Sequence, residues 1–127
     1  MTMVTGARAI DHAAKLDIFR IAVVTTVTAW KHGVSLGFND SALAINLEGE
    51  VELRSAGASE SYPADDRIAL AKRLLDFLGR HVTVATVGAD GALTLIFENG
   101  AEAILRPDPS GYESYIIFLP DETTLVG

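Results

Sequence analysis

The residues whose types could carry out chemistry are few and scattered along this chain of 127 residues. The three histidines, His12, His32 and His81, lack partners at the spacing of a zinc site, and cysteine is absent. The sequence also contains no nucleophile elbow, phosphate-binding loop or dinucleotide-binding glycine motif. We therefore expect a protein that is not an enzyme and that binds neither a metal nor a cofactor.

Three glutamates, Glu48, Glu50 and Glu52, alternate along the chain and could suggest a cation site. Gly49 is expected to turn the chain between them, which would separate their carboxylates. We interpret them instead as a solvated edge that discourages pairing with further strands.

The residues best suited to contact a partner are Trp30, Lys31 and His32, which are consecutive. They are expected at the turn between two strands. The conformation of a turn does not need an aromatic ring, a cation and an imidazole, so these side chains suggest contact with a partner. Tryptophan also contributes strongly to binding energy at interfaces. The structural alternative is that Trp30 folds back onto the sheet.

Four further residues complete the candidate binding set: Arg80, Tyr112, Glu113 and Tyr115. Arg80 and Glu113 are expected to form an ion pair that ties a helix-to-strand corner to the last strand, or else to anchor a polar ligand. The run from Tyr115 to Leu119 is apolar on both faces from Ile116 onward. Such a strand lies either at the centre of a sheet or against a second copy of the protein, which makes a homodimer an open expectation.

The elements that must position these residues are predicted to form an α+β fold with two helices and about seven to eight antiparallel strands. An offset of 59 aligns VSLGFNDSALAI, residues 34–45, with LTLIFENGAEAI, residues 93–104. We interpret this as an internal duplication of one αβ unit, with copies at about 7–55 and 64–119 related by pseudo-twofold symmetry. The alternative is chance similarity between two amphipathic segments. The whole chain, 1–127, is expected to be a single domain.

Within each copy a helix is expected to precede the strands. The first helix is expected at about 7–19, and the second begins at Pro63 and ends at Gly79. In the second helix Ile68, Ala71, Leu75 and Leu78 recur at helical spacing, and Leu74 widens this stripe. The expected strands lie near 21–29, 33–39, 42–47, 50–54, 81–87, 93–97, 101–106 and 112–119. Residues 55–62 are expected to form a loop, and Asn99-Gly100 a two-residue hairpin turn of type I′.

Charge and hydropathy restrict the classes of partner. Ten Lys and Arg against 17 Asp and Glu give a net charge of −7, so the clustered positive charge of a nucleic-acid groove is missing. No apolar run approaches the roughly 20 residues that a membrane-spanning helix needs, and no segment reads as a signal peptide. We expect a cytoplasmic protein that binds neither nucleic acid nor membrane.

Three segments of the second half share one pattern: L-G-R-H-V at 78–82, G-A-L-T-L-I-F-E-N-G at 91–100 and P-D-P-S-G-Y-E-S-Y at 107–115. They resemble a family of small uncharacterised bacterial proteins with the pattern L-G-R-x-V, G-x-L-x-L-x-F-x-(D/N)-G and Y-E-x-W. Tyr115 stands where that pattern has Trp. The family carries no established activity, so the resemblance implies a fold and not a reaction. Some proteins of similar size and composition are immunity proteins that neutralise bacterial toxins.

Two functions follow as expectations. The first is a non-enzymatic binding protein of the immunity or inhibitor type, whose acidic surface meets a basic protein partner. The alternative is a small-ligand sensor or accessory protein with a pocket between the two copies.

Overall fold

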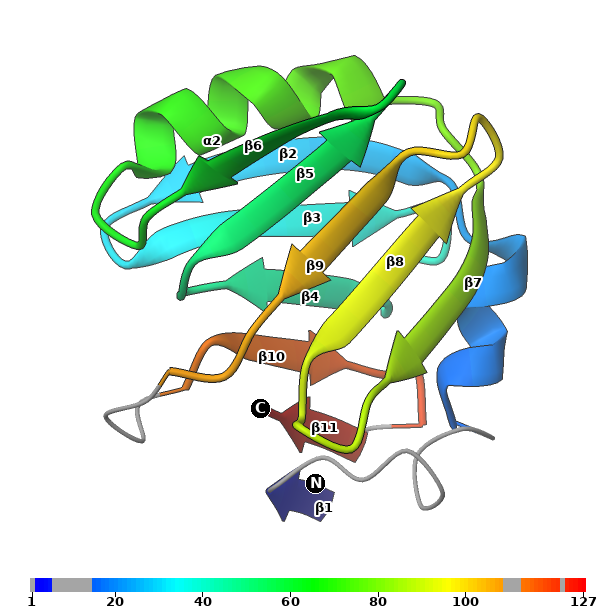
Figure 1. Ribbon diagram of the computed structural model, residues 1–127. Coiled ribbons are helices and arrows are strands. Elements are labelled where there is room, and N and C mark those ends of the chain that lie inside the picture. Colours follow the sequence, from blue (N-terminus) through cyan, green and yellow to red (C-terminus); the bar gives the residue numbers. More distant parts are fainter. Residues whose placement is uncertain (1, 6–14, 109–112, 122) are drawn as a thin grey trace.

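The computed structural model describes residues 2–5, 15–108, 113–121 and 123–127 (Figure 1). β-strand is the main regular structure of this part of the chain, and the strands form two sheets. Its helical parts are the α-helix α2, two short 3-10 helices and the α-helical residues 15–16. None of the described helices is both long and apolar enough to cross a membrane.

The first sheet has six strands in the order β1-β11-β10-β4-β3-β2. Neighbouring strands are antiparallel except β1 and β11, which run parallel. The bounds are β1 Thr2–Thr5, β2 Val24–Trp30, β3 Gly33–Phe38, β4 Ala44–Leu47, β10 Tyr115–Phe118 and β11 Thr123–Val126.

The second sheet has five strands in the order β6-β5-β9-β8-β7, and every neighbouring pair is antiparallel. The bounds are β5 Val51–Ser55, β6 Ala58–Tyr62, β7 Val82–Val87, β8 Leu93–Phe97 and β9 Glu102–Leu105. The chain passes from the first sheet to the second between β4 and β5.

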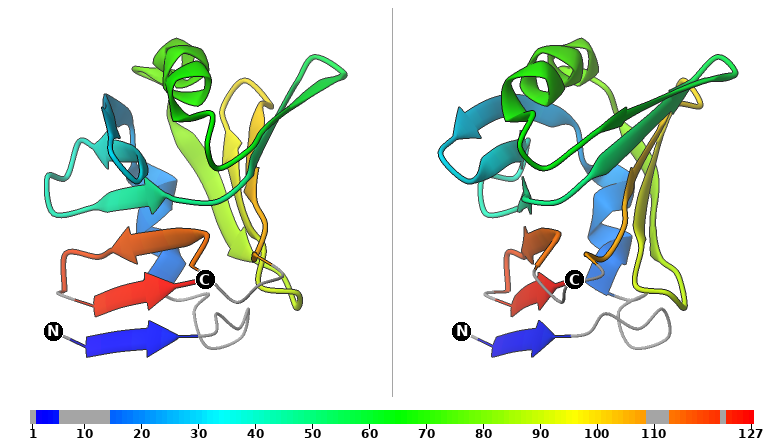
Figure 2. Two further views of the ribbon diagram at one scale, coloured as in Figure 1. Left: turned by 90° about the vertical axis from the view of Figure 1, so that its left-hand side faces the viewer. Right: turned by 60° about the vertical axis from the view of Figure 1, so that its left-hand side comes forward.

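The two sheets face each other, and the core fills the space between them (Figure 2). Alternation of side chains along a strand places one face inward. In β3 this face carries Val34, Leu36 and Phe38, and in β8 it carries Leu93, Leu95 and Phe97, all of them buried. These residues belong to one continuous hydrophobic cluster, so each sheet buries its apolar face against the other.

Two helical segments close the core. The 3-10 helix η1, Asp17–Ile21, inserts Phe19, whose ring lies edge-on to Phe38 at 5.4 Å between centroids. The helix α2, Arg67–Leu74, continues into the 3-10 helix η2, Leu75–Phe77, and contacts β2, β3 and β6. The ring of Phe77 packs against Phe97 at 4.8 Å.

The face that α2 buries differs from the predicted stripe. Leu70, Leu74 and Phe77 are buried, whereas Ile68, Leu75 and Leu78 are 55%, 51% and 43% exposed. Leu70, Leu74 and Phe77 are spaced at i, i+4 and i+7, so the buried stripe keeps the helical period but lies on another face of the helix than the predicted one.

The predicted α+β fold built from two αβ copies is wrong. The chain is mostly β, and its two sheets differ in strand number and order. Residues 7–14 of the expected first helix lie outside the described residues; of the remainder, residues 15–16 are α-helical and 17–19 belong to η1. The 59-residue offset superposes β3 and β4 on β8 and β9, which are antiparallel neighbours of the same kind. The two strand pairs share alternating hydrophobic residues, and among the described residues a helix of more than one turn in the α conformation precedes only the second pair.

Two turns also differ from expectation. Residues 55–62 are not a loop, because Ala56 and Gly57 adopt φ values of 51° and 81° and close a two-residue turn that adds β6 to the sheet. At the β8–β9 turn only Gly100 has a positive φ, 83°. Phe97 donates its N–H to Ala101 O across this turn, which therefore holds three residues and is not the predicted type I′ turn.

Candidate functional site

Three connections meet at one end of the molecule, at the left of Figure 1: the β2–β3 turn, the β4–β5 connection and the residues that lead into β10. The pairing of the strands brings them together. Leu47, the last residue of β4, lies opposite Val34 of β3 on one side and Tyr115 of β10 on the other. The residues after Leu47 and before Tyr115 therefore become neighbours. We call Trp30, His32, Glu48, Glu113 and Ser114 the acidic end.

Close backbone contacts hold the acidic end together. Glu48 N and Gly49 N both donate to Ser114 O, at 2.8 and 2.9 Å. A Cβ atom on Gly49 would lie 2.8 Å from Ser114 Oγ, and a Cβ on Gly33 would lie 2.2 Å from Leu47 O. Glycine is needed at both positions because the neighbouring chain leaves no room for a side chain.

Trp30 and His32 flank the predicted turn. Trp30 is half-buried at the end of β2, while Lys31 and His32 are exposed. The indole and imidazole rings meet edge-on, with 5.2 Å between centroids and an interplanar angle of 81°. The indole Nε1 is buried and has no hydrogen-bond partner in the described part of the chain. Trp30 therefore lies partly against the sheet, with the rest of its surface at the turn.

Electrostatics couple the turn to the two carboxylates. Partial burial raises the pKa of Glu48, and the negative charge of Glu113 raises it further. His32 acts in the opposite direction and lowers the pKa of Glu48. Ser114 is buried, and its Oγ has no partner among the described residues. The two carboxylates thus repel each other near His32, and a cationic group placed there would relieve the repulsion.

The sequence predicts three members of the acidic end, Trp30, His32 and Glu113, together with the neighbouring Lys31. It places Glu48 on a solvated edge and gives no signal for Ser114. Both depend on the pairing of β4 with β10, two strands separated by nearly 70 residues in sequence. The turn expected at Gly49 does connect β4 to β5.

The remaining candidates lie elsewhere. Arg80 faces a hollow beside η2, and within the described part of the chain it forms no ion pair with Glu113. Tyr112 lies outside the described residues. The expected ion pair between the helix corner and the last strand is therefore not formed.

Tyr115 is fully buried, and its hydroxyl donates to Gly91 O at 2.9 Å. Burial raises the pKa of its phenol to about 12. Its strand, β10, lies between β11 and β4, and this central position explains why the strand is apolar on both faces. The apolar faces of β10 are explained without a second copy of the protein, so a homodimer stays a prediction.

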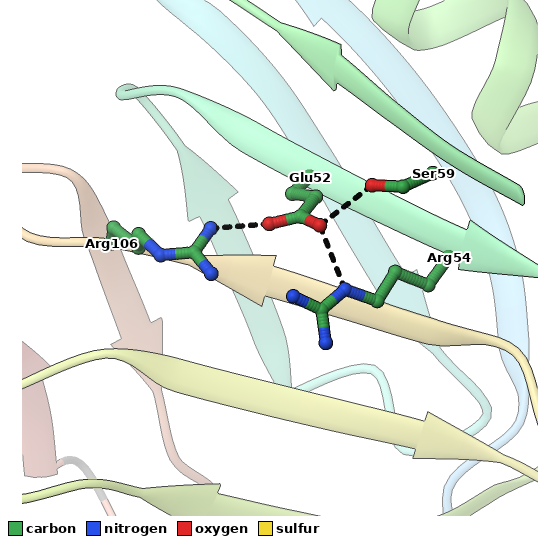
Figure 3. Close-up of polar contacts among 4 residues, drawn as sticks. All are labelled: Glu52, Arg54, Ser59 and Arg106. Carbon is green, nitrogen blue, oxygen red and sulfur yellow. Dashed lines mark hydrogen bonds and ion pairs between the residues drawn. The ribbon is translucent and has the colours of Figure 1, made fainter.

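A second polar cluster lies on the second sheet, where Glu52 accepts three hydrogen bonds (Figure 3). The donors are Ser59 Oγ at 2.6 Å, Arg54 Nε at 2.7 Å and Arg106 Nη1 at 2.5 Å. These bonds lower the pKa of Glu52 to about 2. Both carboxylate oxygens are occupied, so this cluster fastens β5 to β6 and to the end of β9.

Among the described residues, no group of three histidine or acidic side chains is placed to hold a metal ion. Glu52 is turned to its arginines, and Glu48 belongs to the acidic end. Glu48 and Glu52 therefore belong to two different polar clusters.

Comparison with known proteins gives one match. No curated protein and no solved structure matches this chain. A family model described as a family of unknown function matches residues 16–127, which include the second sheet, the first sheet except β1, and the acidic end. The chain therefore belongs to the family of unknown function DUF6188.

Proposed function

We propose that this protein is a non-enzymatic binding protein of the immunity or inhibitor type, and that its acidic end receives a basic group of a protein partner. The observation that carries the proposal is the coupling of Glu48 to Glu113 beside the turn of Trp30 and His32. A guanidinium or ammonium group would neutralise the repulsion between the carboxylates and could lie against the indole ring.

The net charge supports the same type of partner. A charge of −7 attracts a basic protein over a distance, which accelerates encounter. The acidic end is formed by turns and strand ends, which leaves it accessible to a large partner. We further propose, from the sequence, that the protein acts in the cytoplasm.

The alternative of a small-ligand sensor required a pocket between two copies. Hydrophobic side chains fill the space between the two sheets, and the hollow of about 410 Å³ between η1 and β7 opens to solvent beside exposed residues such as Asp17, Arg20 and Val84. For this reason we favour a surface that binds a protein.

Trp30 makes the proposal testable, because it is the only tryptophan and its fluorescence reports on this site. We would titrate the protein with an arginine-rich decapeptide and with the same peptide carrying citrulline, which is neutral and of similar shape. We expect a saturable change in emission with the arginine peptide only. The double variant E48Q/E113Q should weaken binding at least tenfold.

The matched control is D65N/D66N, which also removes two negative charges, from exposed residues before α2. If both double variants weaken binding equally, the peptide senses only net charge and the acidic end is not the site. If the citrulline peptide binds as tightly as the arginine peptide, the protein does not recognise a basic group and the proposal is wrong.

The immunity type makes a separate prediction about the genome. A toxin gene is expected directly beside the gene for this protein, and co-expression of the protein should protect cells from that toxin. Protection that is unchanged in E48Q/E113Q would exclude the acidic end as the surface that neutralises the toxin.

A further inference from the structure

A polar hollow of about 340 Å³ lies away from the acidic end, where the end of α2 and η2 meets two turns of the second sheet. Figure 1 shows these segments together at the upper right, beside the β5–β6 and β8–β9 turns. Its lining includes Ser55, Arg73, Asp76, Phe77, Arg80 and Asn99. We call this hollow the Arg80 pocket. Its volume is within the range of about 300–1,000 Å³ that is typical of small-molecule sites.

One of its two arginines is held in a fixed position. Arg73 Nη1 donates to Asp76 Oδ2 at 2.8 Å, and its Nε lies 3.5 Å from Glu60 Oε1. The guanidinium carbon also lies 5.9 Å from the centroid of the Phe77 ring. These contacts orient Arg73 before any ligand arrives, and they occupy the only carboxylate in the lining of the pocket.

The other donors of the pocket are free within the described part of the chain. The side chains of Arg80 and Ser55 have no hydrogen-bond or ion-pair partner there. Asn99 Oδ1 accepts the N–H of Ala101 at 3.1 Å, which fixes the side chain and leaves the Nδ2 donors without a partner. A guanidinium, a hydroxyl and an amide thus line the same hollow beside a second guanidinium.

From this excess of donors we infer that the Arg80 pocket binds a small oxyanion, either a phosphate group or a carboxylate group of a ligand. Asp76 in the lining and Glu60 beside it both pair with Arg73, so the guanidinium of Arg80 supplies the unpaired positive charge of the pocket. Guanidinium groups bind oxyanions through paired N–H donors, and the hydroxyl and amide can bind the remaining oxygens. This site is independent of the acidic end and takes a ligand of opposite charge.

The inference is tested by isothermal titration calorimetry with inorganic phosphate and, separately, with acetate, at an ionic strength held constant with potassium chloride. We expect saturable binding of at least one anion to the wild-type protein. R80Q should weaken that binding at least tenfold, and S55A by about twofold to fivefold. The tighter of the two anions identifies the group that the natural ligand carries.

Two further variants keep the result interpretable. R80K retains the charge but loses the paired donors, so its affinity should lie between those of the wild type and R80Q. R20Q removes an arginine whose contact is with Asp17, and it should bind as the wild type does. Thermal unfolding shows whether each variant is folded.

The inference is overturned if neither anion binds saturably, or if R80Q and R20Q bind equally well. Emission of Trp30 should not change when the anion binds, because the indole belongs to the acidic end. A failure of the Arg80 pocket therefore leaves the peptide titration unaffected, and the reverse also holds.

Discussion

The substitution Gly33→Ala should destabilise the protein by crowding the β2–β3 turn against β4. Gly33 follows the turn and pairs with Trp30. A Cβ atom at this position would lie 2.2 Å from Leu47 O, whereas an ordinary contact needs 3.4 Å or more. Both groups belong to backbone within one sheet, so no side chain can rotate to relieve the overlap.

The cost follows from this geometry. Overpacking of a well-packed region destabilises by about 1–3 kcal/mol. For a domain of this size, roughly 3–5 °C of melting temperature corresponds to each kcal/mol. We therefore expect Gly33→Ala to melt about 3–15 °C below the wild type when followed by circular dichroism. Its Trp30 emission should also shift, since β3 must move away from β4 beside the indole.

The matched control is Gly88→Ala at the β7–β8 turn. There the added Cβ would lie 2.9 Å from Asp90 Oδ1, an exposed side-chain atom that can move away by giving up the hydrogen bond it accepts from Ala92 N at 3.0 Å. Its cost should stay near that of one exposed hydrogen bond, about 0.5–1 kcal/mol, and below the cost of Gly33→Ala. The reasoning is refuted if Gly33→Ala melts within the error of the wild type, or if Gly88→Ala loses as much stability.

Four further predictions concern three single residues. The pKa of Glu52 is about 2 in the folded protein, below its ordinary value of 4.5. The stabilising contribution of this carboxylate should therefore be lost as the pH falls from about 4.5 through 2. In E52Q, the melting temperature should depend less on pH over this range. The raised pKa of Tyr115 acts at the other extreme, and stability should fall as the pH rises from 10 towards 12, a loss that should be absent from Y115F. At pH 7, Y115F should cost about 0.5–1.5 kcal/mol in urea unfolding, because Gly91 O loses its donor. Gly100→Val should cost about 1–3 kcal/mol in the same assay, since φ is 83° and the strain arises from the backbone alone; an unchanged midpoint would contradict this conformation.

Local pattern predicted the strands well and their arrangement poorly. The alternation in residues 93–97 and the turn residues that follow led directly to β8 and β9. The pairing of β10 with β4 and of β1 with β11 depends on contacts between distant segments, which alternation does not encode. The 59-residue offset does not distinguish a repeated unit from two similar strand pairs that lie in different sheets.

The candidate site shows the same division. The turn at Trp30–His32 was predicted from neighbouring residues, because a strand ends before it and another begins after it. Glu48 and Ser114 become part of the site only through the register that places Leu47 opposite Tyr115. Beta-strand β6 was missed for a local reason, since Ala56 gives no sequence signal for the positive φ that it adopts.

The two proposed sites together specify how a basic partner would approach. The overall negative charge attracts such a partner without selecting an orientation, whereas Glu48 and Glu113 define one end as the docking surface. The unpaired guanidinium of Arg80 would repel the same partner from the other set of turns. Attraction at one place and repulsion at another would together set the orientation, and such a combination discriminates between binding modes more strongly than attraction alone. Because both sites are built on turns above one shared core, their charges can change without altering the packing between the sheets.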